Sequence, residues 1–281
     1  MLSILSLNIA VQNVRILGRS FHRPLDHIEA RLEKLISYLL GTDIDIVCFQ
    51  ELFHADYQHL VFSSVKSVFP YGTGFARKGM KFRLDNELLV LSKYPLTDGQ
   101  LVRFQAAKPE ERIFTSKGFY KVNLEIPEIG KLVLINAHMT AGGLRHHPEG
   151  EHSMNIRSKQ IIQLLQHLPE EGPVIIVGDL NTGPEASREN YLQFIEAGLL
   201  DGFILAEGEG ISWDPENPLV KNGTEHHLSP QRIDHILLNQ AALKIFEPKN
   251  AEIVLTECSI NAGINQIPVS DHYGVLIELH F

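Results

Sequence analysis

The sequence predicts a layered α/β sandwich, in which a pair of mixed or mainly antiparallel sheets carries helices on its outer faces. Short runs rich in Val, Ile, Leu and Phe recur along the chain and are bounded by Gly, Pro, Asp or Asn, which is typical of strands. Segments with a helical spacing of apolar residues lie between some of these runs. The strands outnumber the helices, and several follow one another without a helix between them, which favours antiparallel pairing.

The expected strands are identified mainly by continuous apolar runs, because a strand that is buried on both faces does not alternate. Residues 127–130 contain Pro and Gly and predict a hairpin connection between two of these strands. The predicted strands are residues 2–10, 44–50, 87–92, 118–126, 131–137, 174–178, 233–238 and 275–279.

The expected helices are identified by apolar residues three or four positions apart. In residues 25–40, for example, Ile28, Leu32, Leu35 and Leu39 fall on one helical face. The other predicted helices are residues 54–69, 153–168 and 185–197, the last preceded by Pro184 and followed by Gly198. Residues 206–232 are rich in Gly, Pro and polar residues and predict a long loop.

Composition excludes several classes of protein. The 281 residues are 44% hydrophobic, so the chain can bury a large core and is not intrinsically disordered. With 25 Lys+Arg against 34 Asp+Glu, the net charge is −9, which weighs against tight non-specific binding of nucleic acid. The two cysteines, Cys48 and Cys258, do not indicate a disulfide framework.

No apolar run approaches the roughly 20 residues of a membrane-spanning helix. The first eight residues lack a basic region and a small-residue cleavage site, so they indicate a first strand and not a signal peptide. These features predict a cytoplasmic protein. No linker separates two cores, and we therefore expect residues 1–281 to form a single domain that is a monomer.

Polar residues at the ends of the predicted strands are the main functional signal. Loops on a rigid scaffold are where sites are built, and strand ends at one edge of a sandwich lie close together. Any one such residue is more often a turn or helix-capping residue, but this set contains carboxylates, amides and two histidines. Its members are Asn8, Gln50, Glu51, Asn136, His138, Asp179, Asn181, Asp234, Asp271 and His272.

These residue types suit metal-assisted hydrolysis of a phosphate ester. Carboxylate and amide oxygens are hard ligands that favour Mg²⁺, with Mn²⁺ and Ca²⁺ as alternatives. A histidine next to an aspartate acts as a general base when a second carboxylate orients its ring. Amide and histidine donors stabilise charge on a phosphate.

The ordered motifs Asn8, Gln50-Glu51, Gly178-Asp179-Leu180-Asn181, Arg232-Ile233-Asp234-His235 and Ser270-Asp271-His272 resemble the endonuclease/exonuclease/phosphatase superfamily. The resemblance runs from residue 2 to residue 279. It implies a four-layer α/β/β/α sandwich of the DNase I type and a divalent-metal-dependent phosphoesterase.

The same resemblance implies roles for individual residues. Glu51 would be the main metal ligand, with Asn8 and Asp271 nearby. Asp179 and Asn181 would position the attacking water and the phosphate. His272 would be the general base, held by Asp234, although the superfamily leaves room for Asp179 as the base instead.

Within the superfamily, the segment Asn136-Ala137-His138-Met139-Thr140-Ala141 resembles the His-x-x-Ala segment of neutral sphingomyelinases. This similarity implies that His138 lies near the scissile phosphate as an electrostatic or acid partner. Lys117-Gly118 resembles a segment that precedes a central strand in those enzymes. The implied substrate is a phosphodiester with a phosphocholine-type lipid head group, reached through peripheral contact with a membrane.

Two other classes stay open at the level of sequence. One is a nuclease of the abasic-site endonuclease or exonuclease type, or an inositide or nucleotide phosphatase, on the same scaffold. Its signal is a basic patch formed by Arg77, Lys78, Lys81 and Arg83, which is more often a solvated surface. The other is a catalytically idle binding module, which the complete set of polar residues disfavours.

Overall fold

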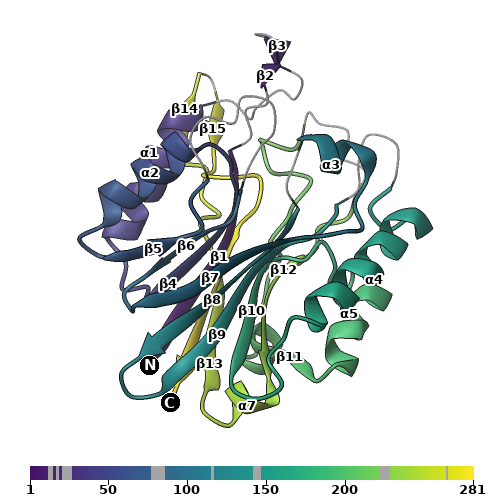
Figure 1. The fold of residues 1–281 in the computed structure, drawn as a ribbon. Helices are drawn as coiled ribbons and strands as arrows, with labels where there is room; N and C mark the ends of the chain where they lie inside the picture. Colours follow the sequence, from purple (N-terminus) through teal and green to yellow (C-terminus); the bar gives the residue numbers. More distant parts are fainter. Residues whose placement is uncertain are drawn as a thin grey trace.

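The computed structural model describes residues 1–281 except 12–14, 17–18, 21–26, 77–85, 115–116, 142–146, 222–227 and 264. Two six-stranded sheets dominate this part of the chain (Figure 1). The first sheet has the order β13 (Glu247–Val254), β16 (Gly274–His280), β1 (Leu2–Val11), β4 (Ile46–Leu52), β6 (Leu89–Ser92), β5 (Tyr71–Thr73). The second has the order β11 (Leu199–Asp201), β12 (Asp234–Asn239), β10 (Val174–Asp179), β9 (Gly130–His138), β8 (Gly118–Ile126), β7 (Leu96–Arg103).

Helices cover the outer face of each sheet, so the four-layer sandwich is confirmed (Figure 1). The first sheet packs against α1 (Ile28–Leu40) and α2 (Ala55–Val65). The second packs against α4 (Glu151–Leu165) and α5 (Arg188–Glu196). The shorter elements are α3 (Pro109–Phe114), α6 (Gly202–Leu205), α7 (Gln240–Leu243), and the two-stranded pairs β2 (Arg15–Ile16) with β3 (Arg19–Ser20) and β14 (Ile260–Ala262) with β15 (Asn265–Ile267).

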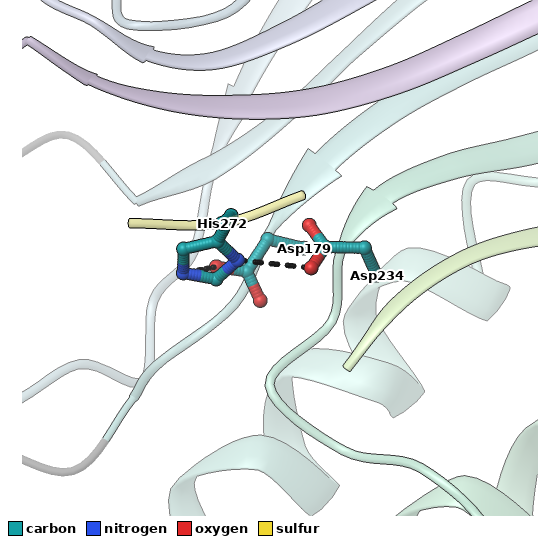
Figure 2. Close-up of side chains that lie close together, drawn as sticks. All are labelled: Asp179, Asp234 and His272. Carbon is teal, nitrogen blue, oxygen red and sulfur yellow. Dashed lines mark hydrogen bonds and ion pairs between the residues drawn. The ribbon is translucent and has the colours of Figure 1, made fainter. Parts of the chain in front are cut away.

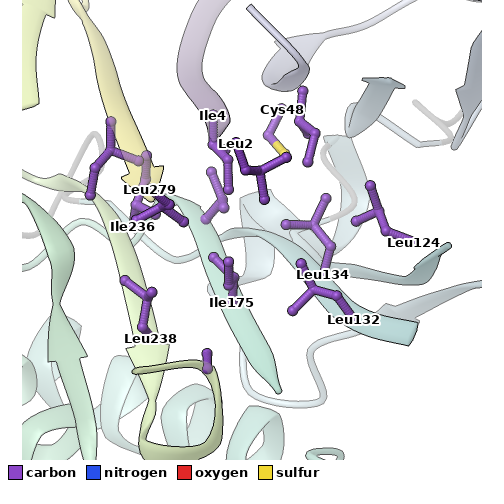
Figure 3. Close-up of a cluster of buried hydrophobic side chains, with 14 of the residues drawn as sticks. Leu2, Ile4, Cys48, Leu124, Leu132, Leu134, Ile175, Ile236, Leu238 and Leu279 are labelled. Atoms are coloured by element: carbon purple, nitrogen blue, oxygen red, sulfur yellow. The ribbon is translucent and has the colours of Figure 1, made fainter. Parts of the chain in front are cut away.

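A hydrophobic core lies between the two sheets (Figure 3). Successive side chains of a strand point to opposite faces, so each central strand contributes to two layers. In β1, Leu2 and Ile4 enter the core between the sheets, whereas Leu5 and Leu7 pack under the helices. This double burial explains why the central strands read as continuous apolar runs in the sequence.

The pairing confirms a mixed topology and corrects one expectation. Strands β1 and β4 are parallel, as are β9 and β10, and the remaining pairs of the two large sheets are antiparallel. The hairpin between β8 and β9 forms as expected. The predicted strands 87–92, 118–126 and 131–137 follow one another without a predicted helix, which favours antiparallel pairing among them. Strand β6, within residues 87–92, pairs instead with β4 and β5 in the first sheet.

Sequence patterns missed the edge strands. Strands β7 and β13 contain no fully buried residue, so they lack the apolar run that identifies the central strands. Residues 206–232, predicted as an unstructured loop, are in part ordered against the core. Trp213 is buried and forms β-bridges with Gln231 and with His272.

We expect Leu134→Ala to lower the free energy of unfolding by about 2–5 kcal/mol, because Leu134 is fully buried between the sheets and its removal leaves a cavity. Urea unfolding monitored by circular dichroism measures the change. The matched control is Ile162→Ala on the exposed face of α4, which should change it by no more than about 0.5 kcal/mol. Equal losses in the two variants would contradict the assignment of the core.

Candidate active site

The candidate site lies at the edge where the inner faces of the strands change from apolar to polar. Asn8 and Gln50 continue the inner faces of β1 and β4 in the first sheet. In the second sheet, Asn136 and His138 continue the inner face of β9, and Asp179 continues the inner face of β10. All five side chains are buried.

Antiparallel pairing brings two further segments to this edge. Strand β12 begins where β10 ends, and Asp234 is in register with Asp179. Strand β16 runs antiparallel to β1, so Asp271 and His272, which precede β16, lie beside the end of β1. The two chain termini lie at the opposite end of the sandwich (Figure 1).

Asp179 is at the centre of the cluster. Its Oδ2 accepts a hydrogen bond of 3.0 Å from Asn8 Nδ2, which crosses from the first sheet to the second. The same oxygen lies 3.3 Å from His138 Nε2 and 3.9 Å from His272 Nε2. Burial raises the pKa of Asp179, but the two histidines together lower it more, so its pKa lies well below the ordinary range.

Asp234 orients His272 (Figure 2). His272 Nδ1 is 2.9 Å from Asp234 Oδ2, and both side chains are buried. Burial lowers the pKa of His272, but Asp234, Asp179 and Asp271 raise it well above its ordinary value. Asp179, Asp234 and His272 also offer ligand atoms that all lie within 4.8 Å of one another, so oxygen and nitrogen donors for a cation are close together here.

His138 is held by a carboxylate that the sequence analysis missed. Its Nδ1 lies 3.0 Å from Glu87 Oε1, and Glu87 is fully buried. On the other side of the ring, Nε2 contacts Lys117 Nζ and lies 3.6 Å from Glu51 Oε1. Burial and Lys117 lower the pKa of His138, but Glu87 and Asp179 outweigh them and raise it to about 9.

An amide pair joins the two sheets beneath the site. Gln50 Nε2 donates to Asn136 Oδ1 over 2.8 Å, and Asn136 Nδ2 donates to the carbonyl oxygen of Phe49 over 2.9 Å. These bonds satisfy buried polar groups between facing strands, so they fix the distance and register of β4 against β9.

Two site residues have left-handed backbone conformations that a non-glycine residue rarely adopts. Glu51 has φ 56° and Asn181 has φ 50°. Asn181 is held by its own backbone N–H, which donates to Asp179 Oδ1 over 3.0 Å, and by Nδ2, which donates to the carbonyl of Met139 over 3.0 Å. Strain of this kind persists only where the surrounding structure holds it, and it clusters at functional sites.

The segment that contains Ser212 and Asn217 is hydrogen-bonded to the backbone at Asp234 and to the backbone just before His272. The Ser212 hydroxyl accepts hydrogen bonds from the backbone N–H groups of Ile233 and Asp234, at 3.1 and 3.2 Å. Asn217 Nδ2 donates to the carbonyl of Ser270 over 3.0 Å. Both side chains are buried. The sequence Ser212-Trp213-Asp214-Pro215-Glu216-Asn217 loosely resembles an Asp/Asn-rich loop of neutral sphingomyelinases, but a turn explains the same residues, so the pattern alone assigns neither side chain to the site.

The structure thus brings most of the predicted site residues into direct contact. Asn8, His138, Asp179, Asp234 and His272 form one buried network, with Glu51 beside His138. Two residues lie at its margin. Asp271 connects to the network through the Ser270 hydroxyl, which lies 3.1 Å from Asp271 Oδ1 and donates to the carbonyl of Asn8 over 2.6 Å. Asn181 is partly exposed. The basic patch formed by Arg77, Lys78, Lys81 and Arg83 lies outside the described residues.

The model of the Endonuclease/Exonuclease/phosphatase family matches residues 5–272 of this chain. The chain belongs to this family. Members are divalent-metal-dependent phosphoesterases, and the buried cluster of carboxylates, amides and histidines agrees with that chemistry. None of the helices in the described part of the chain is both long and apolar enough to cross a membrane.

Similar proteins include a sphingomyelinase C from Leptospira interrogans, which is 22% identical over 261 residues. That alignment covers 87% of this chain and 46% of the relative, so the chain spans about half the length of the curated relative that it matches. Among solved structures, a variant of beta toxin from Staphylococcus aureus with bound magnesium ions is 22% identical, with a TM-score of 0.74 and 98% of each chain covered. A D. rerio TDP2 complexed with a single-strand DNA product is 21% identical, with a TM-score of 0.73 and coverage of 100% of this chain and 99% of that one.

A second buried network supports the start of β12, next to the site. Asp201 Oδ2 lies 2.9 Å from Arg232 Nη1 and 3.0 Å from His235 Nδ1, and it accepts a hydrogen bond of 3.1 Å from the Tyr191 hydroxyl. His235 Nε2 lies 2.6 Å from the carbonyl of Thr182. Burial raises the pKa of Asp201, but His235 and Arg232 lower it far below the ordinary range.

We expect Asp201→Asn to lower the free energy of unfolding at neutral pH by about 3–5 kcal/mol, because it removes the charge partner of the buried Arg232. Folding depresses the pKa of Asp201, so this stabilisation is present above the ordinary value of 3.8 and is lost as the pH falls below it. The gap between wild type and variant should therefore narrow between about pH 4 and pH 2 in urea unfolding experiments.

Asp43→Asn is the matched control, because Asp43 also pairs with a cation, Lys93, but its own side chain is exposed. It should destabilise the protein much less than Asp201→Asn does. A stability gap for Asp201→Asn that stays constant down to pH 2 would contradict the assigned linkage.

Proposed function

We propose that this protein is a divalent-metal-dependent phosphodiesterase that cleaves a phosphocholine-type head group from a lipid. The observation that carries the catalytic part is the geometry of His272. Its Nδ1 is engaged by Asp234 at 2.9 Å, and its Nε2 faces Asp179 at 3.9 Å in a cluster that contains a further histidine. A ring held in this way has one nitrogen available for proton transfer.

The candidate metal ligands are Glu51, Asn8 and Asp271. Carboxylate and amide oxygens are the donors that Mg²⁺ prefers, and Mn²⁺ and Ca²⁺ share this preference. In the same cluster, Asp179, Asp234 and His272 offer further ligand atoms that all lie within 4.8 Å of one another. These features fit a divalent cation, and Mg²⁺ is the ion that we propose. When bound, the ion would stabilise negative charge that develops on the phosphoryl oxygens.

In this proposal His272 takes a proton from the attacking water at Nε2, and Asp234 keeps the ring oriented and balances the imidazolium that forms. Asp271 is one of the groups that raise the pKa of His272, so cationic charge held at Asp271 brings that pKa back down. Asp179 and Asn181 position the water and the phosphate, and the carboxylate of Asp179 is the alternative base.

His138 is proposed as the electrostatic or acid partner of the phosphate. Its Nε2 faces Glu51 and Asp179, and Lys117 Nζ contacts the same nitrogen. Two cationic groups therefore lie beside the candidate ligands, where a phosphate oxygen would need stabilisation. Glu87 holds the ring from the far side.

The substrate class is supported by the sphingomyelinase-like segment around His138 and by the similarity to a sphingomyelinase C. A substrate of this kind implies peripheral contact with a membrane or micelle surface. The similarity to TDP2, whose structure contains a single-strand DNA product, makes nucleic acid the outcome to test against it.

We expect Mg²⁺-dependent hydrolysis of bis(p-nitrophenyl) phosphate, a generic phosphodiester, that is lost with a chelator. His272→Ala should lower kcat by about 10²–10⁴-fold, the usual contribution of a general base. Glu51→Gln should remove the stimulation by Mg²⁺. The matched control is Glu171→Gln, which should keep wild-type rates. Glu171 is an exposed carboxylate that precedes the first residue of β10, whereas Asp179 is at the other end of that strand. A His272→Ala protein with full activity would exclude the assigned base.

We expect phosphocholine release from sphingomyelin in mixed micelles, measured with Mg²⁺ and with chelator. His138→Ala should abolish the release, whereas Glu87→Gln, which keeps an acceptor for Nδ1 but removes the charge, should lose less. His280→Ala, at the exposed end of β16, is the control for loss of a histidine. An enzyme that cleaves the generic phosphodiester but no choline lipid would contradict the proposed substrate and agree with the chemistry of the family. Nucleotides or inositides would then be the candidate substrates, and plasmid nicking would test the nuclease alternative.

A further inference from the structure

A bulge shapes the backbone that carries two of the candidate metal ligands. Asn8 is in register with Gln50, and the next matched pair is Val11 with Leu52. Ile9 and Ala10 therefore lie opposite the single residue Glu51. Ala10 and Glu51 both have left-handed backbone conformations, with φ 49° and 56°. A bulge turns side chains out of the regular pleat, and here it sets how the side chains of Asn8 and Glu51 sit relative to each other.

The carbonyl oxygens of this bulge are bound by an arginine from the helical layer. Arg31 of α1 is fully buried, and its guanidinium donates to the carbonyls of Ile9 and, at 3.4 Å, of Ala10. Its Nε donates over 2.7 Å to the carbonyl of Val269, two residues before Asp271. One side chain thus holds together the β1 bulge, which lies opposite Glu51, and the segment before Asp271.

The positive charge of Arg31 interacts with two of the candidate metal ligands, Asp271 and Glu51. Within the described part of the chain, the hydrogen bonds of Arg31 all go to backbone carbonyls and none goes to a carboxylate that would neutralise the guanidinium. Burial lowers the pKa of Arg31 to about 10, while Asp271 and Glu51 act against that change, so the side chain stays charged at neutral pH. A buried charge is tolerated where nearby opposite charge and several hydrogen bonds compensate it, and these two carboxylates supply the charge.

We propose that Arg31 is a positioning residue for the metal site: its guanidinium holds the β1 bulge and the segment before Asp271 in the arrangement in which Asn8, Glu51 and Asp271 bind a divalent cation. This inference rests on the proposed function, because it takes those three residues as the ligands. Residues that orient metal ligands through hydrogen bonds contribute strongly to affinity, and their loss typically weakens binding about 10–100-fold.

The chain offers a matched control on the other side of the sandwich. Arg157 of α4 is also fully buried, and it donates to the carbonyl of Thr140 over 2.9 Å and to the Ser187 hydroxyl over 2.6 Å. Among the described residues, its hydrogen bonds go to loops beside the second sheet and to α5, and none goes to the bulge or to the segment before Asp271. Comparing variants of Arg31 and Arg157 therefore separates the general effect of losing a buried guanidinium from the loss of the hydrogen bonds to the bulge and to Val269.

The experiment measures Mg²⁺ binding to the intact chain by isothermal titration calorimetry, with circular dichroism and thermal unfolding of each variant. Arg31→Met, which keeps volume but removes charge and donors, should raise the Kd for Mg²⁺ about 10–100-fold. Arg31→Lys, which keeps the charge but binds fewer carbonyls, should raise it less. Arg157→Met should unfold at a lower temperature than wild type while its Kd for Mg²⁺ stays within about twofold.

A folded Arg31→Met protein with the wild-type Kd would overturn the proposal, and so would an equal increase in Kd for Arg157→Met. If Arg31→Met fails to fold, Arg31→Lys decides, and an unchanged Kd in that variant overturns the role of Arg31. Glu51→Gln tests the proposed function separately: binding that is unchanged in Glu51→Gln would refute the ligand assignment itself.

Discussion

The whole site depends on one constraint, the need to satisfy buried polar groups where the core between the sheets ends. The inner faces of β1, β4, β9 and β10 are apolar along most of their length and then present amides, carboxylates and a histidine. Such groups cost several kcal/mol to bury without partners, so bonds across the gap between the sheets stabilise the fold. The bonds of Asn8 to Asp179 and of Gln50 to Asn136 do this, and they join the two sheets at the point where the site is built.

The same constraint concentrates negative charge. Asp179, Asp234 and Glu87 are all buried within one network. Their negative charge raises the pKa of both histidines, and the two histidines and Lys117 in turn lower the pKa of Asp179. An excess of buried carboxylate favours cations, whether these are imidazolium, ammonium or a metal ion. A fold that needed only stability would gain from apolar residues here, and this supports the proposal that the cluster is a functional site.

The outer helical layers contribute more than apolar cover. Arg31 of α1 donates hydrogen bonds to the carbonyls of the bulge near the end of β1, and Arg157 of α4 donates to the carbonyl of Thr140 after β9. The left-handed conformation of Ala10 lies in the backbone that Arg31 holds. The geometry at the end of β1 therefore depends on the helical layer over the first sheet as well as on the sheet itself.

The sequence by itself determined the fold class, the central strands and the set of polar residues at their ends, because burial on both faces leaves continuous apolar runs and the motifs are local. Strand β8, for example, has the predicted bounds of residues 118–126. Only the tertiary structure decided which residues meet. Glu87 and Arg31 look like ordinary residues at the start of a predicted strand and within a predicted helix, the edge strands β7 and β13 lack an apolar pattern, and β6 joins the first sheet. The pairing register places Asp234 opposite Asp179 and the bulge opposite Glu51. Contacts of this kind join residues far apart in the chain and depend on register and on the packing of layers, and no local pattern encodes either of them.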